Sequence, residues 1–313
     1  GLVGSEMCIR DSCDAGPNVC RAYPRKNIGA GYNAEMMPIL SGGKDKWYRP
    51  SDVAVGPDGS LFIADWYDPG VGGHGMRDLE RGRIFRVIPK DHNGYSFAKR
   101  NVNTLDGAIN ALMSSDLESR YLGWKSLHKM GLDKTEKALM KLISDKDRIK
   151  RARAAWCLGK MPGAGDKVIS KISKDLDSDM RIVAIRLARQ LGSNVESLIS
   201  ELSNDVSFQV KRECAIALRE LDGENVAKLW AKLALQHNGS DRWYLEALGI
   251  AADGNWDNCF KAWIEAGGKW DSKAGKDIVW RSRGKMAPEF LAKIVKGPNT
   301  NEEEKPCLLY TSD

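Results

Sequence analysis

An internal repeat constrains the fold of this 313-residue chain more than any other feature. Five arginines keep the phase, each 30 or 31 residues after the one before: Arg120, Arg151, Arg181, Arg212 and Arg242. Three residues after each arginine stands a small or apolar residue: Gly123, Ala154, Ala184, Ala215 and Leu245. Self-similarity at a fixed period of this length indicates stacked copies of one supersecondary unit.

Most copies also carry a start signal, a stop signal or both. An aspartate precedes the first three arginines by four residues, and a glycine or proline follows the first four by eleven: Asp116, Asp147 and Asp177, then Gly131, Pro162, Gly192 and Gly223. Apolar residues recur between them at the helical spacing i, i+3, i+4 and i+7. Each copy is therefore predicted as a helix, an Asp-bearing turn, an Arg-bearing helix and a stop. This pattern resembles HEAT-like repeats, which implies an α-solenoid.

The arginine column has two interpretations. It is either a structural ladder that pairs with the Asp-bearing turns, or a ligand-binding row on the concave face of the solenoid. After the repeat, six tryptophans crowd together at Trp230, Trp243, Trp256, Trp263, Trp270 and Trp280. They predict a core that caps the last repeat, or else a docking face for a following domain.

Before the repeat, the hydrophobic period is that of strands. Strands are predicted at Ser51–Val55, Ser60–Trp66 and Arg83–Ile88, with a Gly-Pro-Asp-Gly turn between the first two. Residues 18–41 are also predicted as β structure, interrupted by a Gly-Ala-Gly turn. Sheets this small bury little apolar surface, so we expect them to belong to a larger assembly.

The stretch PSDVAVGPDGSLFIADWYDPGVGGHGMRD, followed by GRIFRV, resembles the closing blade of a known family of β-propellers. These are the "membrane-bound dehydrogenase domain" proteins of planctomycetes and verrucomicrobia. Their propellers are similar to those of glucose and sorbosone dehydrogenases, and are followed by HEAT-type repeats and a cytochrome c domain. The resemblance covers residues ~20–90 and implies a multidomain α+β chain, in which the last blade or so of a propeller precedes an α-solenoid of HEAT-like repeats.

The expected domain limits follow from these patterns. Residues 13–100 are predicted as the end of the propeller, and residues 101–298 as the solenoid with its Trp-rich cap. Residues 1–12 and the end of 299–313 resemble translated sequencing adaptor, so we set them aside as artefact. Residues 299–305 are expected to be a linker. The chain is then expected to be a piece of a longer protein.

Candidate site residues lie where the predicted strands end. The first strand begins and the second ends at the same edge, which brings Asp52 toward Asp65 and Asp68. The Gly-rich loop with His74 and Arg77 is expected above them. Such a cluster would suit a cofactor carboxylate, a cation or a sugar hydroxyl. The alternative is structural, since a carboxylate after a strand often binds backbone N–H groups of its own sheet.

The resemblance implies a quinone-dependent sugar or alcohol dehydrogenase that passes electrons to a downstream haem domain. Pyrroloquinoline quinone and haem c would then belong to the longer protein, and this piece alone would be inactive. The alternative is a non-catalytic extracytoplasmic scaffold that binds carbohydrate or protein. Either way we expect a periplasmic or extracytoplasmic location, with a cytochrome-like domain or another protein as partner on the solenoid.

Net charge and the positions of the cysteines argue against several other classes of function. The net charge of +6 is dispersed over mixed faces, which argues against a dedicated nucleic-acid surface, and no apolar run is long enough to span a membrane. Cys157, Cys214 and Cys259 stand among apolar residues and are predicted as buried thiols. Cys13 and Cys20 lack the spacing of a zinc or redox motif, and no metal site is expected.

Overall fold

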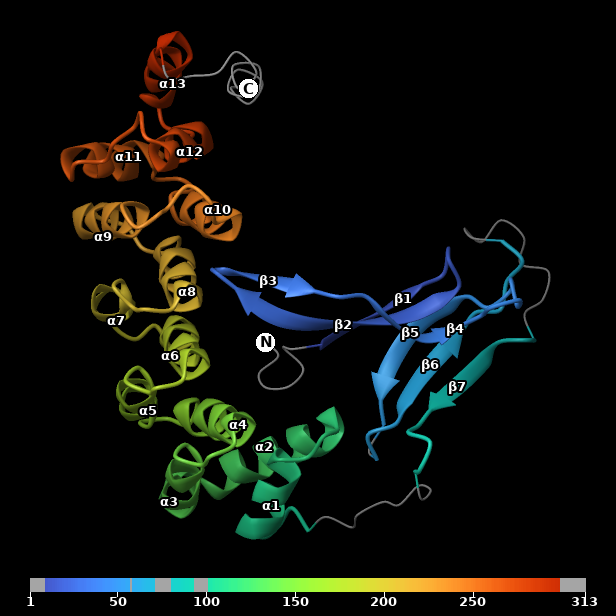
Figure 1. Ribbon diagram of the computed structural model, residues 1–313. Helices are drawn as coiled ribbons and strands as arrows, with labels where there is room; N and C mark the ends of the chain where they lie inside the picture. The colour runs from blue at the N-terminus through green and yellow to red at the C-terminus, as the bar shows by residue number, and fades with distance from the viewer. Residues whose placement is uncertain (1–8, 57, 71–79, 93–100, 299–313) are drawn as a thin grey trace. The chain divides into compact units, whose positions relative to one another are not determined.

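The computed structural model describes residues 9–56, 58–70, 80–92 and 101–298 (Figure 1). In this part of the chain, seven strands precede thirteen helices, so the coarse prediction of a mixed α+β chain with a helical C-terminal region is confirmed. The strands form two small antiparallel sheets. Neither sheet closes into a barrel or a propeller within the described residues.

The first sheet has four strands, with β2 at its centre. The strands are β1 (Ile9–Asp14), β2 (Val19–Ile28), β3 (Gly31–Ala34) and β4 (Met37–Ser41). β2 pairs with β1, β3 and β4. The Gly-Ala-Gly turn connects β2, which is ten residues long, to β3, as predicted. β1 begins at Ile9, inside the segment that we had set aside.

The second sheet contains the three strands predicted before and after the Gly-rich loop. β5 (Pro50–Val55), β6 (Leu61–Asp65) and β7 (Arg83–Val87) pair in that order. Ile63, in the middle strand, is fully buried, and its neighbours across the sheet are Val53 and Phe85. Gly59 has φ +84°, as the predicted turn requires. The strand predictions are therefore confirmed to within two residues at each end.

The helices begin after Thr104. They are α1 (Leu105–Leu112), α2 (Leu117–Met130), α3 (Leu132–Leu142), α4 (Arg148–Gly159), α5 (Gly165–Ile172), α6 (Ser178–Leu191), α7 (Val195–Leu202), α8 (Phe208–Leu218), α9 (Glu224–Ala234), α10 (Arg242–Ala251), α11 (Trp256–Glu265), α12 (Lys273–Arg281) and α13 (Ala287–Lys296).

The repeat's aspartates start its helices. Asp116, Asp147 and Asp177 are the N-caps of α2, α4 and α6, and each carboxylate accepts a hydrogen bond from a backbone N–H of the first turn. Asp241 does the same for α10. Gly192 ends α6 in the left-handed conformation, with φ +64°. The turn and stop residues therefore act through local hydrogen bonds and backbone geometry.

The described residues form two compact units. Unit 1 takes its residues from 1–26 and 33–164, and unit 2 from 27–32 and 165–313. The border between the units therefore does not coincide with the change from strands to helices. In unit 1, α1 packs on α2 and α3 on α4, and the two sheets meet where β1 contacts β5.

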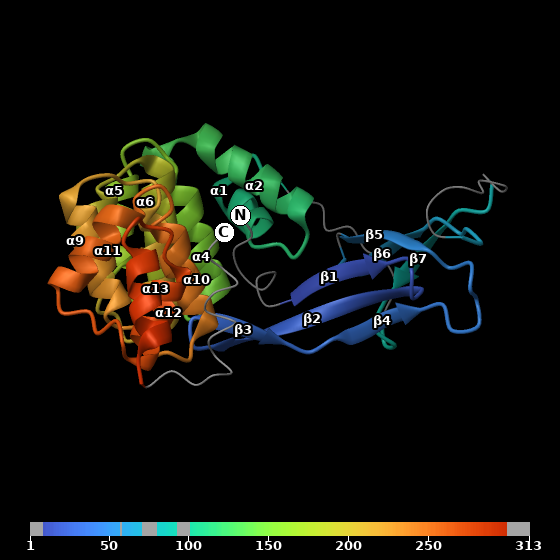
Figure 2. The ribbon, with the colours of Figure 1, turned by 90° about the horizontal axis from the view of Figure 1, so that it is seen from above.

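Unit 2 is a stack of helices in two layers. Along one layer α6 contacts α8, α8 contacts α10 and α10 contacts α12; along the other, α7 contacts α9 and α9 contacts α11. The stack is visible in Figure 1, and the view from above separates α9 and α11 from α10 (Figure 2). Each added helix pair covers the apolar face of the pair before it.

The small residues of the repeat allow close helix packing. Ala154, Ala184 and Ala215 are fully buried. A Cβ atom added to Gly123 in α2 would lie 2.4 Å from the backbone nitrogen of Leu112, at the end of α1. A larger side chain at this position would have to push the two helices apart.

Candidate functional site

The predicted acidic cluster lies in unit 1, where Asp65 ends β6. Its side chain is fully buried, and both carboxylate oxygens are used. Oδ1 accepts hydrogen bonds from the backbone N–H groups of Arg49 (2.7 Å) and Tyr67 (3.0 Å). Oδ2 accepts one from Nε of Arg83 at 2.7 Å. This arrangement ties the start of β5, the end of β6 and the start of β7 together, and leaves no lone pair of Asp65 aimed at solvent.

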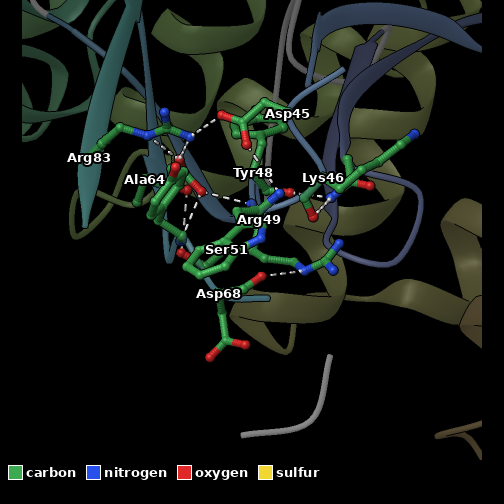
Figure 3. A network of polar contacts seen from close by, with 12 residues as sticks. Asp45, Lys46, Tyr48, Arg49, Ser51, Ala64, Asp68 and Arg83 are labelled. Carbon is green, nitrogen blue, oxygen red and sulfur yellow. Dashed lines mark hydrogen bonds and ion pairs between the residues drawn. The ribbon is translucent and has the colours of Figure 1, made fainter. Parts of the chain in front are cut away.

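Arg83 extends this network to Asp45, which precedes the second sheet. Its Nη2 lies 2.9 Å from Oδ2 of Asp45 and 2.6 Å from Oδ2 of Asp65 (Figure 3). The hydrogen bond from Arg83 holds the pKa of Asp45 below its usual value. The guanidinium also stacks on the ring of Tyr67, 4.0 Å from its centroid.

Arg49 holds the loop that contains Asp68. Its Nε donates to the carbonyl oxygen of Asp68 at 3.1 Å, and its Nη1 to that of Ala15 at 2.9 Å (Figure 3). The carboxylate of Asp68, only 6% exposed, accepts from the backbone N–H of Gly70 at 2.7 Å. Arg49 thus bonds to the carboxylate of Asp65 and to the main chain of Asp68, and both acids are parts of a network that fixes the loop.

Asp52 does not join them. It pairs with Ala64 across the sheet, whereas Asp65 pairs with Pro50, so Asp52 and Asp65 point to opposite faces. Asp52 is exposed, and its carboxylate accepts a local hydrogen bond from Val53 N–H at 2.8 Å. The expected convergence of the three acids is therefore wrong for Asp52, because we considered the strand ends and not the alternation of side chains along the strand.

His74 and Arg77 lie outside the described residues. Their expected place above the acids stays a prediction, as does any ligand at this edge of the sheet. Within the described residues, the geometry of Asp65 and Asp68 favours the structural interpretation of these two acids.

The repeat's arginines have unlike surroundings. Arg181 makes a two-pronged ion pair with Asp205 in the turn of the next repeat, at 2.6 and 2.8 Å, and these hydrogen bonds raise its pKa. Arg242 is largely exposed and pairs with Glu246 at 2.5 Å within α10. Arg181 thus pairs with an aspartate in a turn, whereas Arg242 pairs with a glutamate of its own helix. The ladder as a feature of the whole column, including Arg120 and Arg151, stays a prediction.

Other arginines that sequence reasoning missed connect successive helices of unit 2. Arg186 of α6 binds both oxygens of Glu213 in α8 at 2.9 Å, and Arg281 of α12 binds Glu246 in α10 at 2.9 Å. These pairs do not follow the 30-residue phase, so no periodic signal marks them.

The fourth arginine of the column, Arg212 on α8, bonds to a segment that lies far earlier in the chain. Residues 27–32, here called the hairpin tip, belong to unit 2 although their neighbours in sequence belong to unit 1. Nη1 of Arg212 donates to the carbonyl oxygen of Ala30 at 2.6 Å, and Nη2 to the hydroxyl of Tyr32 at 3.0 Å. The guanidinium lies 5.0 Å from the centroid of the Tyr32 ring.

Three further side chains complete what we call the turn site, formed by Gln209, Arg212, Asp241 and Trp243. Nε2 of Gln209 donates to the carbonyl oxygens of Gly29 (3.1 Å) and Gly31 (2.5 Å). Oδ2 of Asp241 accepts from the backbone N–H of Ala30 at 2.7 Å, while its Oδ1 caps α10. The hairpin tip is therefore bound mainly through its main chain.

The turn site leaves no room for side chains at either glycine of the hairpin tip. A Cβ atom on Gly31 would lie 2.0 Å from the Trp243 ring, and one on Gly29 would lie 2.3 Å from Oδ2 of Asp241. Gly29 also has φ +53°. Ala30 between them is fully buried. The signal in the sequence was the Gly-Ala-Gly motif. It was predicted as a turn between two strands, and its contacts with the helices were not predicted.

The tryptophans divide between core and surface. Trp230, Trp256 and Trp263 are buried, and Trp230 stacks edge-on against Trp256 at 5.8 Å. Trp243 is 55% exposed and contributes its ring to the turn site. The predicted capping core is therefore present in part, and the docking face for a following domain stays a prediction.

The cysteines of the helices are as predicted. Cys157, Cys214 and Cys259 are all fully buried, and burial raises the pKa of Cys157 and of Cys259 to about 12. In the part of the chain that the structure describes, no group of His, Cys, Asp and Glu side chains is arranged to hold a metal ion. Nor does any described helix combine the length and apolarity needed to cross a membrane.

Comparison with known proteins matches part of the chain to a family model. A family model described as a domain of unknown function (DUF7133) matches residues 33–91, a range that includes β4 to β7 and the acidic network. This range is less than half of the chain, and the description states no activity. No curated protein matches the chain. The comparisons thus connect the sheet region to a family without a known function.

Proposed function

We propose that this chain is a binding scaffold, made of a partial β-propeller and a HEAT-like α-solenoid, whose helices hold extended segments by their main chain. The observation that carries the proposal is the turn site, where α8 and the start of α10 bind three carbonyl groups and one N–H of the hairpin tip. In peptide recognition, main-chain hydrogen bonds contribute affinity and side-chain fit contributes specificity, and the Trp243 ring against Gly31 supplies the fit here.

The charges around the site support a binding role. Arg212 is 6% exposed, and Glu213 beside it lies 3.9 Å away and is itself held by Arg186. A buried guanidinium is stable only where acceptors surround it, so this network fixes Arg212 in position to meet the carbonyl of Ala30. Arg186 and Glu213 thus help to hold Arg212 in position.

The test uses the full chain with Gly31→Val, which removes the fit of the hairpin tip. A fluorescently labelled peptide of residues 26–34 should then bind in trans, because the vacated turn site can accept it. The same peptide carrying Gly31→Val should not bind, and Arg212→Ala in the protein should abolish binding. Arg219→Ala, which removes an exposed arginine of α8's C-terminal end that pairs with Asp253, is the matched control.

Failure of the wild-type peptide to bind a Gly31→Val chain that keeps its helical circular dichroism would refute the scaffold proposal. Equal binding of the two peptides would also count against it, because recognition would then not depend on the glycine.

We propose a second function for the longer protein: a quinone-dependent sugar or alcohol dehydrogenase that passes electrons to a haem domain outside the cytoplasm. Its support is the resemblance of the P-S-D-V-A-V-G-P-D-G motif to a propeller blade, together with the three antiparallel strands β5, β6 and β7. Pyrroloquinoline quinone and haem c would be held by other parts of that protein, and carbohydrate would be the substrate.

Dye reduction in the presence of pyrroloquinoline quinone and glucose or sorbosone separates the two proposals. The chain alone should show none, and a longer protein that contains it should reduce the dye. A longer protein that binds the quinone and oxidises neither these sugars nor simple alcohols would leave the scaffold as the better account.

A further inference from the structure

Two cysteines that the sequence did not connect face each other in the first sheet. Cys13 of β1 is the direct cross-strand partner of Cys20 in β2. The ladder continues on both sides of this pair, with Ser12 opposite Arg21 and Asp14 opposite Val19. The two thiols are therefore placed by a regular register and not by a chance approach of loops.

This position suits a disulfide bond. Directly opposite residues of an antiparallel pair have Cα atoms about 4.5–5.5 Å apart, which is inside the range of about 4.4–6.8 Å that disulfides span. Their side chains leave the sheet on the same face. Cys20 is fully buried, while Cys13 is partly exposed. A reagent in solution can thus reach the sulfur of Cys13, and the sulfur of Cys20 is shielded from it.

The turn between the two cysteines is held in place by its own contacts. Arg21 and Asp14 form an ion pair at 2.6 Å across the hairpin. The side-chain amide of Asn18 donates to the carbonyl oxygens of Lys46 (3.2 Å) and Tyr48. The Tyr48 side chain is buried next to the sulfurs, since burial and the neighbouring Cys20 and Cys13 thiols raise the pKa of its phenol. A fixed turn keeps the register that brings Cys13 opposite Cys20.

We propose that Cys13 and Cys20 are joined by a disulfide bond when the protein meets a small-molecule disulfide. The thiolate of Cys13 attacks the disulfide RSSR, which forms a mixed disulfide and releases one RS⁻. The thiolate of Cys20 then attacks the sulfur of Cys13 and releases the second RS⁻. The two protons from the cysteines end on the two RSH products, so two thiols and RSSR become one protein disulfide and two RSH.

The bond is expected at this pair and not at the helical cysteines. Cys157, Cys214 and Cys259 stand on three different helices, α4, α8 and α11, and all are fully buried. None of them has a cysteine as its neighbour in a ladder. The reaction therefore selects Cys13 and Cys20 by access and by register.

The experiment uses the full chain in its native state, incubated with oxidised glutathione. The protein is then quenched with acid, unfolded in guanidinium, alkylated with iodoacetamide and digested with trypsin. Cleavage after Arg10 and Arg21 leaves both cysteines in the peptide Asp11–Arg21. This peptide should be two hydrogen atoms lighter than the reduced form and carry no alkyl group, and prior treatment with dithiothreitol should restore two alkyl groups.

Two controls show whether the native register is responsible. Oxidation of the unfolded chain should give mixed pairings in place of this single product. With Cys13→Ser, the peptide should carry one alkyl group on Cys20. Full alkylation of Cys13 and Cys20 after oxidation of the wild type would overturn the proposal. So would a stable glutathione adduct on Cys13, or a bond from Cys20 to Cys8.

Discussion

At the scale of the residue, two aspartates of the second sheet differ in how many groups they hold together. Asp65 satisfies two backbone N–H groups and the Arg83 side chain from a fully buried position. Asp52, thirteen residues earlier, is exposed and accepts a hydrogen bond from the backbone next to it. The same residue type thus connects three strands at one position and bonds locally at the other.

Replacement of Asp65 by alanine should therefore lower the free energy of unfolding by about 3 kcal/mol, because two backbone N–H groups and the partly exposed Arg83 lose an acceptor that is fully buried. Asp52→Ala is the matched control and should change it by less than about 0.5 kcal/mol. Urea unfolding followed by circular dichroism measures both. Equal, small effects would mean that the Asp65 network contributes little to stability.

The low pKa of Asp58 gives a prediction about the dependence of stability on pH. Hydrogen bonds from Ser60, and then the hydrogen bond and charge of Arg86, hold its pKa well below the usual value of 3.8. A depressed pKa in the folded state contributes stability that is complete above the usual value and is lost as the pH falls through the folded value. Ser60→Ala should therefore raise the Asp58 pKa in an NMR titration. Ser51→Ala, whose hydroxyl bonds to Ala64, should leave it unchanged.

At the scale of the element, helices are joined by pairs that cross from one repeat to the next. Arg181 in α6 holds Asp205, whose Oδ1 also accepts from the N–H of Ser207, the N-cap of α8. The ion pair therefore connects one helix to the start of another. The side chains are largely shielded, with 12% of Arg181 and 7% of Asp205 exposed.

Arg181→Ala should reduce the free energy of unfolding by about 1–3 kcal/mol, since Asp205 is left shielded without its cation. Arg219→Ala removes an ion pair of which both side chains are more than half exposed, and should cost less than about 0.5 kcal/mol. The midpoints of urea unfolding give the comparison. A shift for Arg181 no larger than that for Arg219 would contradict the ladder at this position.

At the scale of the whole molecule, the hairpin tip makes the chain pass from unit 1 into unit 2 and back before the helices begin. Ala30 is buried against α8 and α10, whereas Ala34, four residues later, is exposed. Binding of the hairpin tip should therefore protect the backbone beside it, because a protease needs an extended and detached segment.

Ala30→Glu should speed tryptic cleavage after Lys26 by about tenfold or more, because a second carboxylate next to Asp241 detaches the hairpin tip. Ala34→Glu is the matched control and should leave the rate unchanged. The appearance of the peptide that ends at Lys26, followed by mass spectrometry, gives both rates. Equal rates for the two variants would show that the turn site does not hold the hairpin tip in solution.

Local signals in the sequence determined the elements of this protein. The period of apolar residues set the strands at Pro50–Val55 and Leu61–Asp65, and Asp147 and Gly192 set a helix start and a helix end. These signals act over a few residues, through N-cap hydrogen bonds, backbone φ and the alternation of side chains. Both partners of such an interaction lie in the same short segment, so the sequence of that segment is enough to predict it.

Only the tertiary structure decided which residues meet. Arg212 keeps the phase of the repeat, yet its partner is a carbonyl 182 residues earlier in the chain. Cys13 faces Cys20 because of the register of β1 and β2, and Asp65 meets Arg83 because of the register of β6 and β7. The residue types at these positions would suit many partners. Their actual partners depend on the path of the backbone, which no short-range pattern encodes.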